Sequence, residues 1–262
     1  MRTLLPVGDS AQTPDDTTDV HAHYATNWIE NGGVRVNFVS SVDGSATVEG
    51  KSRGLQTPGD NQIFAALRDL ADVILVGAST ATKEGYQPSR PSATRQAKRA
   101  EYGLSPFPAS AVMSASLNID LSSKLYSDAS PQAPTLIITS STAPLARRND
   151  IIDLAGGDRG LQLLEAPSVD GGGVDFAHAA AELRSLGYRR ILCEGGPRLF
   201  SAGLLSRAVD ELCLSITPML TGPGSPTITA GDEWPEDFLP QLTLTGLLTE
   251  DDALFCRYRV RH

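Results

Sequence analysis

Short, uninterrupted apolar segments recur along the chain from Val34 onward, and polar turns or helical segments separate them. Most of these segments do not alternate between apolar and polar residues, which is typical of strands buried on both faces of a sheet. Such strands need helices on both sides, so the expected fold class is α/β. The predicted strands are residues 34–40, 73–77, 111–114, 135–139, 161–164, 190–193, 211–217, 242–248 and 254–260.

Helical signals lie between several of these strands. Thr57 can cap a helix that has a proline at its first position and the acid Asp60 in its first turn. Further helices are predicted over residues 176–186 and from Pro197 onward. Strands that alternate with helices predict a mainly parallel central sheet flanked by helices. The turn at residues 250–252 predicts that the last two strands form an antiparallel hairpin on the edge of that sheet.

The start of the chain differs from the rest. Residues 1–27 are polar, with Thr and Asp concentrated in residues 12–19, so we expect residues 1–30 to form a loosely held arm or a wrapping segment outside the core. No internal repeat or domain linker interrupts residues 31–262, which are expected to form a single domain. A chain of this length buries roughly 70–75% of its unfolded surface and needs no disulfides to fold.

The charge balance excludes several classes of partner. The chain has 22 Lys and Arg against 31 Asp and Glu, which gives a formal net charge of −9. Since affinity for nucleic acids and anionic membranes comes largely from cationic side chains, we expect neither as a partner. A small anionic ligand stays open, because local geometry decides whether it binds.

The three cysteines Cys193, Cys213 and Cys256 each lie in an apolar segment, and the sequence contains no Cys-x-x-Cys pair. We interpret them as buried thiols in a reducing compartment. The sequence has no apolar run of about 18 residues, and its first residues are too few and too polar for a signal peptide. These features predict a cytoplasmic protein.

The sharpest local signal is the run Glu194-Gly195-Gly196-Pro197 between a predicted strand and a predicted helix. Paired glycines let backbone N–H groups approach a ligand, and the start of the helix offers unpaired N–H groups and a positive dipole end to a pyrophosphate. The alternative is a tight turn in which the glycines serve only packing. Glu194, at the strand end, is either a ligand contact or a solvated carboxylate.

Two other strand ends carry small polar residues. Asp43 follows an apolar strand in the run Ser-Ser-Val-Asp-Gly, which suits either acid–base chemistry or an ordinary Asp-Gly turn. The strand that ends at Gly77 leads into a hydroxyl-rich loop with Thr80. That loop suits either nucleotide binding or the cap of a short helix.

Positive charge is concentrated in one stretch of the chain, residues 83–99. Together with Arg68, this basic patch is the best candidate site for a ligand phosphate, and a solvated helix face is the alternative for Arg95, Lys98 and Arg99. No Cys and His residues have the spacing of a zinc site, so we expect no metal. Nor does a nucleophile motif accompany the histidines, which argues against a hydrolase. The cations of the patch are Lys83, Arg90, Arg95, Lys98 and Arg99.

The segments 37–44, 54–60, 67–80 and 194–199, followed by Thr217-Pro218-x-Leu220-x-Gly222, together resemble the pyrimidine reductases of riboflavin biosynthesis. These are the reductase half of bifunctional deaminase–reductases, and the resemblance covers about residues 35–260. It implies a dihydrofolate-reductase-like fold and a homodimer. The implied activity is that of an NADPH-dependent 5-amino-6-(5-phosphoribosylamino)uracil reductase, which transfers a hydride to C1′ of a ribosylamino-pyrimidine phosphate.

The resemblance also implies roles for individual residues. The catalytic candidates are Asp43, which would assist proton transfer, and Glu194, which would contact substrate. The substrate-binding candidates are Asn37, Ser52, Arg68 and Arg90. The candidates for binding NADPH are Val39, Gly54, Gly77, Thr80, Glu84, Ser114, Gly195, Gly196, Pro197, Arg198, Leu199 and Phe200.

The sequence departs from the family pattern in three ways. Asn37 replaces the usual Lys of the first strand, Gly54 replaces the usual Trp of a Ser-x-Trp run, and the deaminase half is missing. The first change removes a fixed cation, and the second removes an aromatic platform and predicts a pocket open to a wider ring. Two other functions therefore stay open: a stand-alone dihydrofolate-reductase-like enzyme that acts on a pterin, and an NADP-binding module without catalysis.

Overall fold

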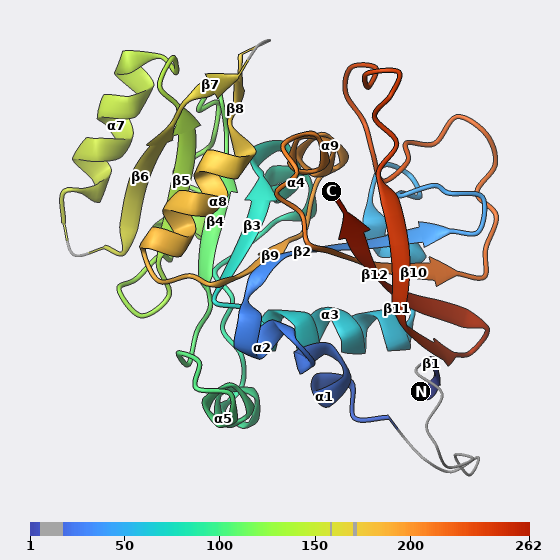
Figure 1. The fold of residues 1–262 in the computed structure, drawn as a ribbon. Coiled ribbons are helices and arrows are strands. Elements are labelled where there is room, and N and C mark those ends of the chain that lie inside the picture. Colours follow the sequence, from blue (N-terminus) through green and yellow to red (C-terminus); the bar gives the residue numbers. More distant parts are fainter. Residues whose placement is uncertain (6–17, 158, 170–171) are drawn as a thin grey trace.

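One large sheet runs through the computed structural model, which describes residues 1–5, 18–157, 159–169 and 172–262 (Figure 1). Its strands are β1 (Arg2–Leu5), β2 (Gly33–Ser41), β3 (Val73–Gly77), β4 (Ala109–Met113), β5 (Thr135–Ser140), β6 (Leu161–Ala166), β9 (Arg190–Cys193), β10 (Glu211–Thr217), β11 (Gln241–Glu250) and β12 (Ala253–Arg261). They lie in the order β1-β11-β12-β10-β2-β9-β3-β4-β5-β6. A small separate sheet pairs β7 (Ser168–Val169) with β8 (Gly173–Val174).

The sheet is mainly parallel, as the sequence predicts. Every pairing from β10 through β2, β9, β3, β4 and β5 to β6 is parallel, whereas β12, β11 and β1 run antiparallel to their neighbours. The predicted C-terminal hairpin is confirmed: β11 and β12 are joined at Asp251 and Asp252, both with positive φ, as a tight hairpin turn requires. The hairpin is not the edge of the sheet, however, because β1 pairs with β11 outside it.

Helices cover both faces of the sheet (Figure 1). Successive side chains of a strand point to opposite faces of the sheet. Val73 and Leu75 of β3 therefore pack with α8 and α9, whereas Val76 packs with α4 and α7 on the other face. Elsewhere in the sheet, Leu192 of β9 and Cys213 of β10 pack against α1 and α3. The helices are α1 (Val20–Ala25), α2 (Trp28–Asn31), α3 (Pro58–Leu70), α4 (Ala78–Glu84), α5 (Ala93–Glu101), α6 (Lys124–Ser127), α7 (Leu145–Ala155), α8 (Phe176–Ser185) and α9 (Pro197–Leu205), with the 3₁₀ turn η1 at Ser52–Leu55.

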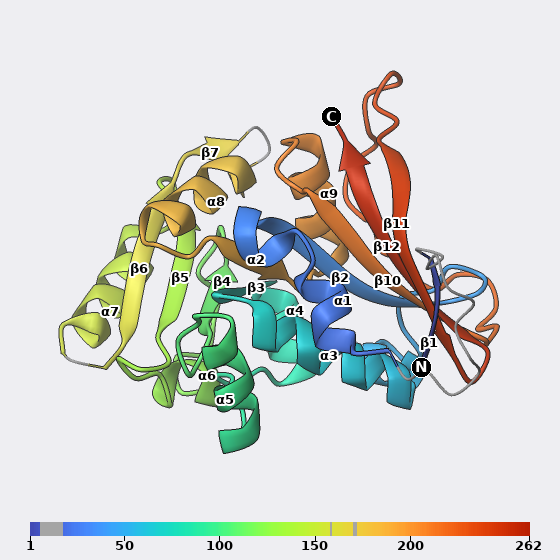
Figure 2. The same ribbon diagram turned by 60° about the horizontal axis from the view of Figure 1, so that its bottom comes forward.

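The expectation that residues 1–30 stay outside the core is wrong for the part that the structure describes. Val20, Tyr24 and Trp28 are buried against α3 and the sheet, and Figure 2 shows α1 beside α3. Arg35 of β2 donates to the carbonyl of Tyr24 (2.6 Å) and lies over the ring of Trp28. The sequence does not reveal this packing, because polar residues separate the few aromatic side chains that are buried. The Thr- and Asp-rich stretch falls largely on residues 6–17, outside the described residues.

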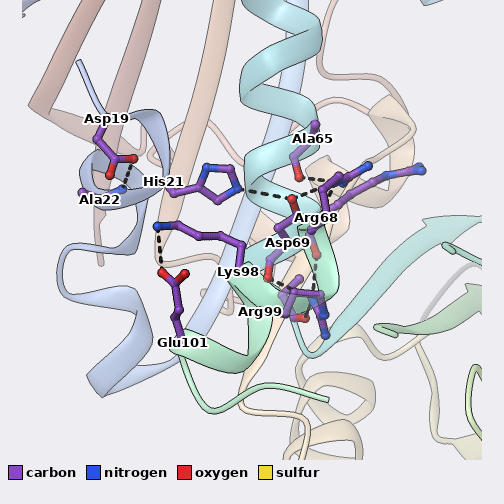
Figure 3. Close-up of polar contacts among 11 residues, drawn as sticks. Asp19, His21, Ala22, Ala65, Arg68, Asp69, Lys98, Arg99 and Glu101 are labelled. Atoms are coloured by element: carbon purple, nitrogen blue, oxygen red, sulfur yellow. Dashed lines mark hydrogen bonds and ion pairs between the residues drawn. The ribbon is translucent and has the colours of Figure 1, made fainter. Parts of the chain in front are cut away.

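The basic stretch is also placed differently from the expectation. Arg99 is fully buried, and its Nη1 donates to the carbonyls of Arg68, Asp69 and Ala71 at the end of α3 (Figure 3). Arg95 pairs with the Asp69 carboxylate (Nε to Oδ2, 2.8 Å), which His21 of α1 also contacts. Arg95 and Arg99 therefore fasten α5 to α3, and the His21 side chain joins α1 to the same Asp69. The single solvated face expected for Arg95, Lys98 and Arg99 does not form.

The cysteines lie where the sequence predicts. Cys193, Cys213 and Cys256 are free and buried, and burial raises the pKa of Cys193 and of Cys213 to about 12. These two thiols are therefore unreactive at neutral pH. None of the helices in the described ranges has the length and apolar character that crossing a bilayer requires.

Candidate functional site

Two strand-to-helix turns meet at the carboxyl ends of the parallel strands. The N–H of Gly77, at the end of β3, donates to the carbonyl of Gly195 (2.8 Å), and the N–H of Glu194 donates to the carbonyl of Leu75 (2.9 Å). The loop before α4 and the loop before α9 are thereby held side by side. In open α/β sheets this edge is where ligands bind.

Both glycines of the second turn are required by their neighbours. Gly195 has φ +76°, and a Cβ there would lie 2.7 Å from the ring of Phe38. A Cβ on Gly196 would meet the Thr80 hydroxyl. Gly196 is also the N-cap of α9 and supplies no side-chain cap. The first N–H groups of α9 therefore face the space beside Thr80 without a side-chain partner from the cap residue.

A cavity of about 1110 Å³, called here the Ser114 cavity, opens beside this turn. It lies along the ends of β3 and β4 and the starts of α4 and α9. The predicted strand at 111–114 ends one residue earlier, so Ser114 is the first residue after β4 and faces the cavity. The predicted cofactor residues that line it are Gly77, Thr80, Ser114, Gly196, Pro197, Arg198 and Leu199.

A second cavity of about 520 Å³, the Asn37 cavity, adjoins the first. Thr80, Lys83, Gly196 and Pro197 line both, so the two cavities adjoin at these residues and are together called the cleft. Among the described residues that line the Asn37 cavity, Lys83 is the one with a cationic side chain. The predicted residues brought together here are Asn37, Val39, Ser52, Thr80, Glu84, Glu194, Gly196 and Pro197.

A buried ion pair forms one wall of the Asn37 cavity. Arg68 of α3 grips Glu194 with two hydrogen bonds of 2.7 Å, and the Tyr86 hydroxyl donates to the same carboxylate (2.6 Å). Burial alone would lower the pKa of Arg68, but the adjacent Glu194 raises it above its usual value. Burial and the charge of Glu194 raise the pKa of Tyr86 well above its usual value, so its hydroxyl stays protonated. The Glu194 side chain is 3% exposed, which corrects the reading of a solvated carboxylate.

Asp43 is not among the described residues that line the two cavities. Its exposed carboxylate accepts hydrogen bonds from Ser41 Oγ and from the backbone N–H groups of Thr221 (3.0 Å) and Gly222 (2.8 Å). The Ser41 hydroxyl and these N–H groups lower the pKa of Asp43 to about 2. The group is therefore ionised at neutral pH and fastens one loop to another, which does not fit the expected role in proton transfer.

Other predicted site residues lie outside the two cavities. Arg90 is exposed and donates to the carbonyl of Asp128 (2.8 Å). Arg68 points its guanidinium at Glu194, so it reaches the cavity only through that carboxylate. Gly54 is exposed, and a Cβ there would lie 2.7 Å from the Val48 side chain, so it does not widen the pocket as expected. Phe200 is buried and packs against Phe38.

Sequence reasoning missed two residues of this site, Tyr86 and Asp60. Tyr86, just past the end of α4, carries no sequence signal for its contact with Glu194. Asp60 lines the Asn37 cavity, although its position in the first turn of a helix predicts only a favourable charge for that helix. Lys83 is among the cations predicted to bind a ligand phosphate, and the fold separates it from Arg95, which pairs with Asp69.

The residues of the Ser114 cavity suit a dinucleotide. A side chain on Gly196 would fill the gap beside Thr80, and the start of α9 adds N–H groups that its N-cap residue leaves without a side-chain acceptor, together with the exposed cation Arg198. Backbone donors at a helix start, flanked by cations, are the usual cradle of a pyrophosphate. Lys83, shared with the other cavity, supplies a second cation.

Comparison with known proteins gives a consistent family. Residues 33–254 match the family model described as the RibD C-terminal domain. The chain is 26% identical over 203 residues to the 2,5-diamino-6-ribosylamino-4(3H)-pyrimidinone 5′-phosphate reductase of Archaeoglobus fulgidus, covering 77% of this chain and 87% of that protein. It is 23% identical to the riboflavin biosynthesis protein RibD of Aquifex aeolicus, over 73% of this chain but only 48% of that protein.

Solved structures point the same way. A pyrimidine reductase-like protein from Corynebacterium diphtheriae superposes with a TM-score of 0.78 at 27% identity, covering 94% of this chain and all of that one. RibD of Acinetobacter baumannii has a TM-score of 0.66 at 17% identity and shows that the fold is shared. This chain covers 58% of that RibD chain.

We predict that Glu194→Ala lowers the free energy of unfolding by about 3–5 kcal/mol, because it leaves the Arg68 guanidinium buried without its carboxylate. Denaturant unfolding at neutral pH measures the change. The control is Glu101→Ala, which breaks the exposed pair with Lys98 and should cost less than about 1 kcal/mol. Equal losses for the two variants would show that the Arg68–Glu194 pair does not hold this wall of the cavity.

Proposed function

Because the chain belongs to the family of RibD C-terminal domains, we propose that it is an NADPH-dependent reductase of riboflavin biosynthesis. It transfers a hydride to C1′ of a 6-(ribosylamino)pyrimidine 5′-phosphate. The observation that carries this proposal is the pair of adjoining cavities that share Thr80, Lys83, Gly196 and Pro197. Two reactants bound in adjoining cavities lie next to each other at the residues that line both, and hydride transfer requires that proximity.

The Ser114 cavity is the proposed cofactor site, and NADPH bound there supplies the hydride. Gly196 lets the backbone of α9 approach the pyrophosphate, and Arg198 lies where it can balance its charge. Ser114 and Thr80 offer hydroxyl groups along the same cavity. These residues bind and orient the cofactor.

The Asn37 cavity is the proposed substrate site. Lys83 is the cation available there for the substrate phosphate, a role expected earlier for Arg90. Glu194 Oε2 accepts from both Arg68 and Tyr86, whereas Oε1 accepts only from Arg68 and keeps a lone pair that can accept from a sugar hydroxyl in a fixed position. Phe38 and Phe64 line the cavity and exclude water from the reacting carbon.

We also propose that the enzyme works as a cytoplasmic homodimer. The free, buried cysteines suit a reducing compartment. The C-terminal hairpin exposes Leu242, Leu244 and Leu254 at 37–40% of their surface, which leaves an apolar strip on a regular two-stranded surface. An isologous contact between two such strips would bury it.

We expect the purified chain to oxidise NADPH when a ribosylamino-pyrimidine 5′-phosphate is added, and not when either reactant is left out. Loss of NADPH absorbance and chromatography of the ribitylamino product measure the reaction. Turnover with dihydrofolate but with no pyrimidine phosphate would favour the pterin reductase. Cofactor binding without turnover of either substrate would favour the non-catalytic module.

The variant Gly196→Val should weaken NADPH binding at least about tenfold. The added side chain meets Thr80 and pushes the start of α9 from the cofactor, and one charge-assisted hydrogen bond is worth about 1.5–3 kcal/mol. Fluorescence titration with NADPH measures the affinity. A matched control is Gly157→Val, where the nearest atom to a Cβ is 3.8 Å away and lies outside both cavities. Unchanged binding by the Gly196 variant would contradict the placement of the cofactor.

Sedimentation velocity at micromolar concentration should show a dimer, and Leu244→Lys should shift the equilibrium toward monomer because it places a charge in the apolar strip. Leu145→Lys, at an exposed apolar position on α7, serves as the control and should leave the dimer intact. A wild-type chain that sediments only as a monomer would exclude the proposed contact.

A further inference from the structure

The Asn37 cavity holds a buried polar atom that no protein group satisfies. Asn37 is 9% exposed, and its Oδ1 is buried without a hydrogen-bond partner in the described part of the chain. Asn37 lies in the middle of β2 and lines the cavity. A buried acceptor left unpaired costs free energy, so its presence at a cavity wall indicates a donor on the ligand.

A second acceptor lines the same cavity. Asp60, in the first turn of α3, is 3% exposed, and its backbone N–H is used by the Thr57 cap. Burial raises the pKa of its carboxyl, and the hydroxyl of Ser215 on β10 offsets part of that rise. Burying this carboxylate is costly unless donors face it, and a ligand with N–H groups would supply them.

The sheet register brings these groups to one face. In the parallel pair of β2 and β10, Asn37 lies opposite Cys213 and Val39 lies opposite Ser215. Residues two apart point to the same face of a strand, and Cys213 packs against α3. Asn37 and Ser215 therefore point toward the face that α3 covers, where Asp60 meets Ser215. The cavity floor thus presents a carboxylate and an amide oxygen as acceptors, next to the ring of Phe64.

We propose that Asp60, assisted by Asn37, makes this site specific for a 2-amino-4-oxopyrimidine ring and against a uracil ring. In the 2-amino ring, N3–H and the 2-amino group are adjacent donors that a carboxylate accepts side by side. In uracil the group at position 2 is a carbonyl, whose oxygen would face the carboxylate. The substrate is thereby the 2,5-diamino-6-ribosylamino-pyrimidinone phosphate, and no deamination needs to precede reduction.

The identity of the complete substrate rests on the proposed function. The recognition of the 2-amino-4-oxo ring edge by Asp60 and Asn37 does not depend on it. A dihydropterin carries the same 2-amino-4-oxo edge, so it is the second possible source of that chemistry. The phosphorylated ribosylamine and the pterin differ in everything beyond the ring edge, and turnover separates them.

The test begins with ring ligands that have no sugar, added to the enzyme saturated with NADP⁺. Calorimetry compares 2,5,6-triaminopyrimidin-4-one with 5,6-diaminouracil, which differ in the group at position 2 and in the proton that the uracil carries on N1. We expect the 2-amino ring to bind at least about tenfold more tightly, because the other ring leaves buried acceptors unpaired. Equal affinity, a preference for the uracil, or no detectable binding of either ring would overturn the proposal.

The variant Asp60→Asn replaces one carboxylate oxygen by an amide that can donate to the uracil carbonyl. The ratio of the two affinities should fall at least about tenfold, while NADP⁺ binding stays within the range of the wild type. Asp120→Asn is the matched control, because Asp120 is exposed and bonded to Ser122 in a surface turn. An unchanged ratio in Asp60→Asn would overturn the assignment to Asp60.

Turnover of the complete substrates tests the ring specificity and the proposed function separately. Reduction of the diaminopyrimidinone phosphate in preference to the uracil phosphate supports both. Equal reduction of the two phosphates leaves the proposed function standing and overturns the specificity. Preference for the 2-amino ring together with reduction of dihydrofolate alone supports the ring recognition and refutes the proposed function.

Discussion

The contact between Arg68 and Glu194 determines where the cleft can be. It joins the last turn of α3 to the residue that follows β9, and Tyr86 brings the chain beyond α4 to the same carboxylate. Three segments distant in the sequence thus converge on one buried anion. Such a pair adds little net stability compared with apolar packing, but each partner requires the other. Its value here is positional, because it fixes the wall between the core and the Asn37 cavity.

The distribution of arginines explains how an acidic chain builds sites for anions. Arg35 and Arg99 are fully buried. Arg35 pairs with Glu211, and Arg99 donates to backbone carbonyls at the end of α3. These cations organise the fold and offer nothing to a ligand. The cleft relies instead on Lys83, Arg198 and the backbone donors at the start of α9. Net charge is therefore a poor guide to what the cleft accepts, whereas the few cations without a partner among the described residues are a good one.

Local patterns predicted the elements of this fold better than the roles of its polar side chains. The bounds of β3, β9 and β10 follow from their apolar runs, and the turn at Gly195 and Gly196 is visible because only glycine fits beside Phe38 and Thr80. Asp43 and Arg99 show why prediction stops there. An Asp-Gly run fixes the turn but not the loop that the carboxylate binds, and a basic residue looks solvated until the fold encloses it. Partners more than 25 positions away, as for Arg99, leave no local trace.

The wall common to the two cavities couples what they hold. Thr80, Lys83, Gly196 and Pro197 cannot adjust to one occupant without presenting a changed surface to the other. By thermodynamic linkage, if a ligand in one cavity changes the affinity for a ligand in the other, the second ligand changes the affinity for the first by the same factor. Under the proposed assignment of the two cavities, the affinity of an inhibitor for one is therefore coupled, through four residues, to the redox state of the cofactor in the other.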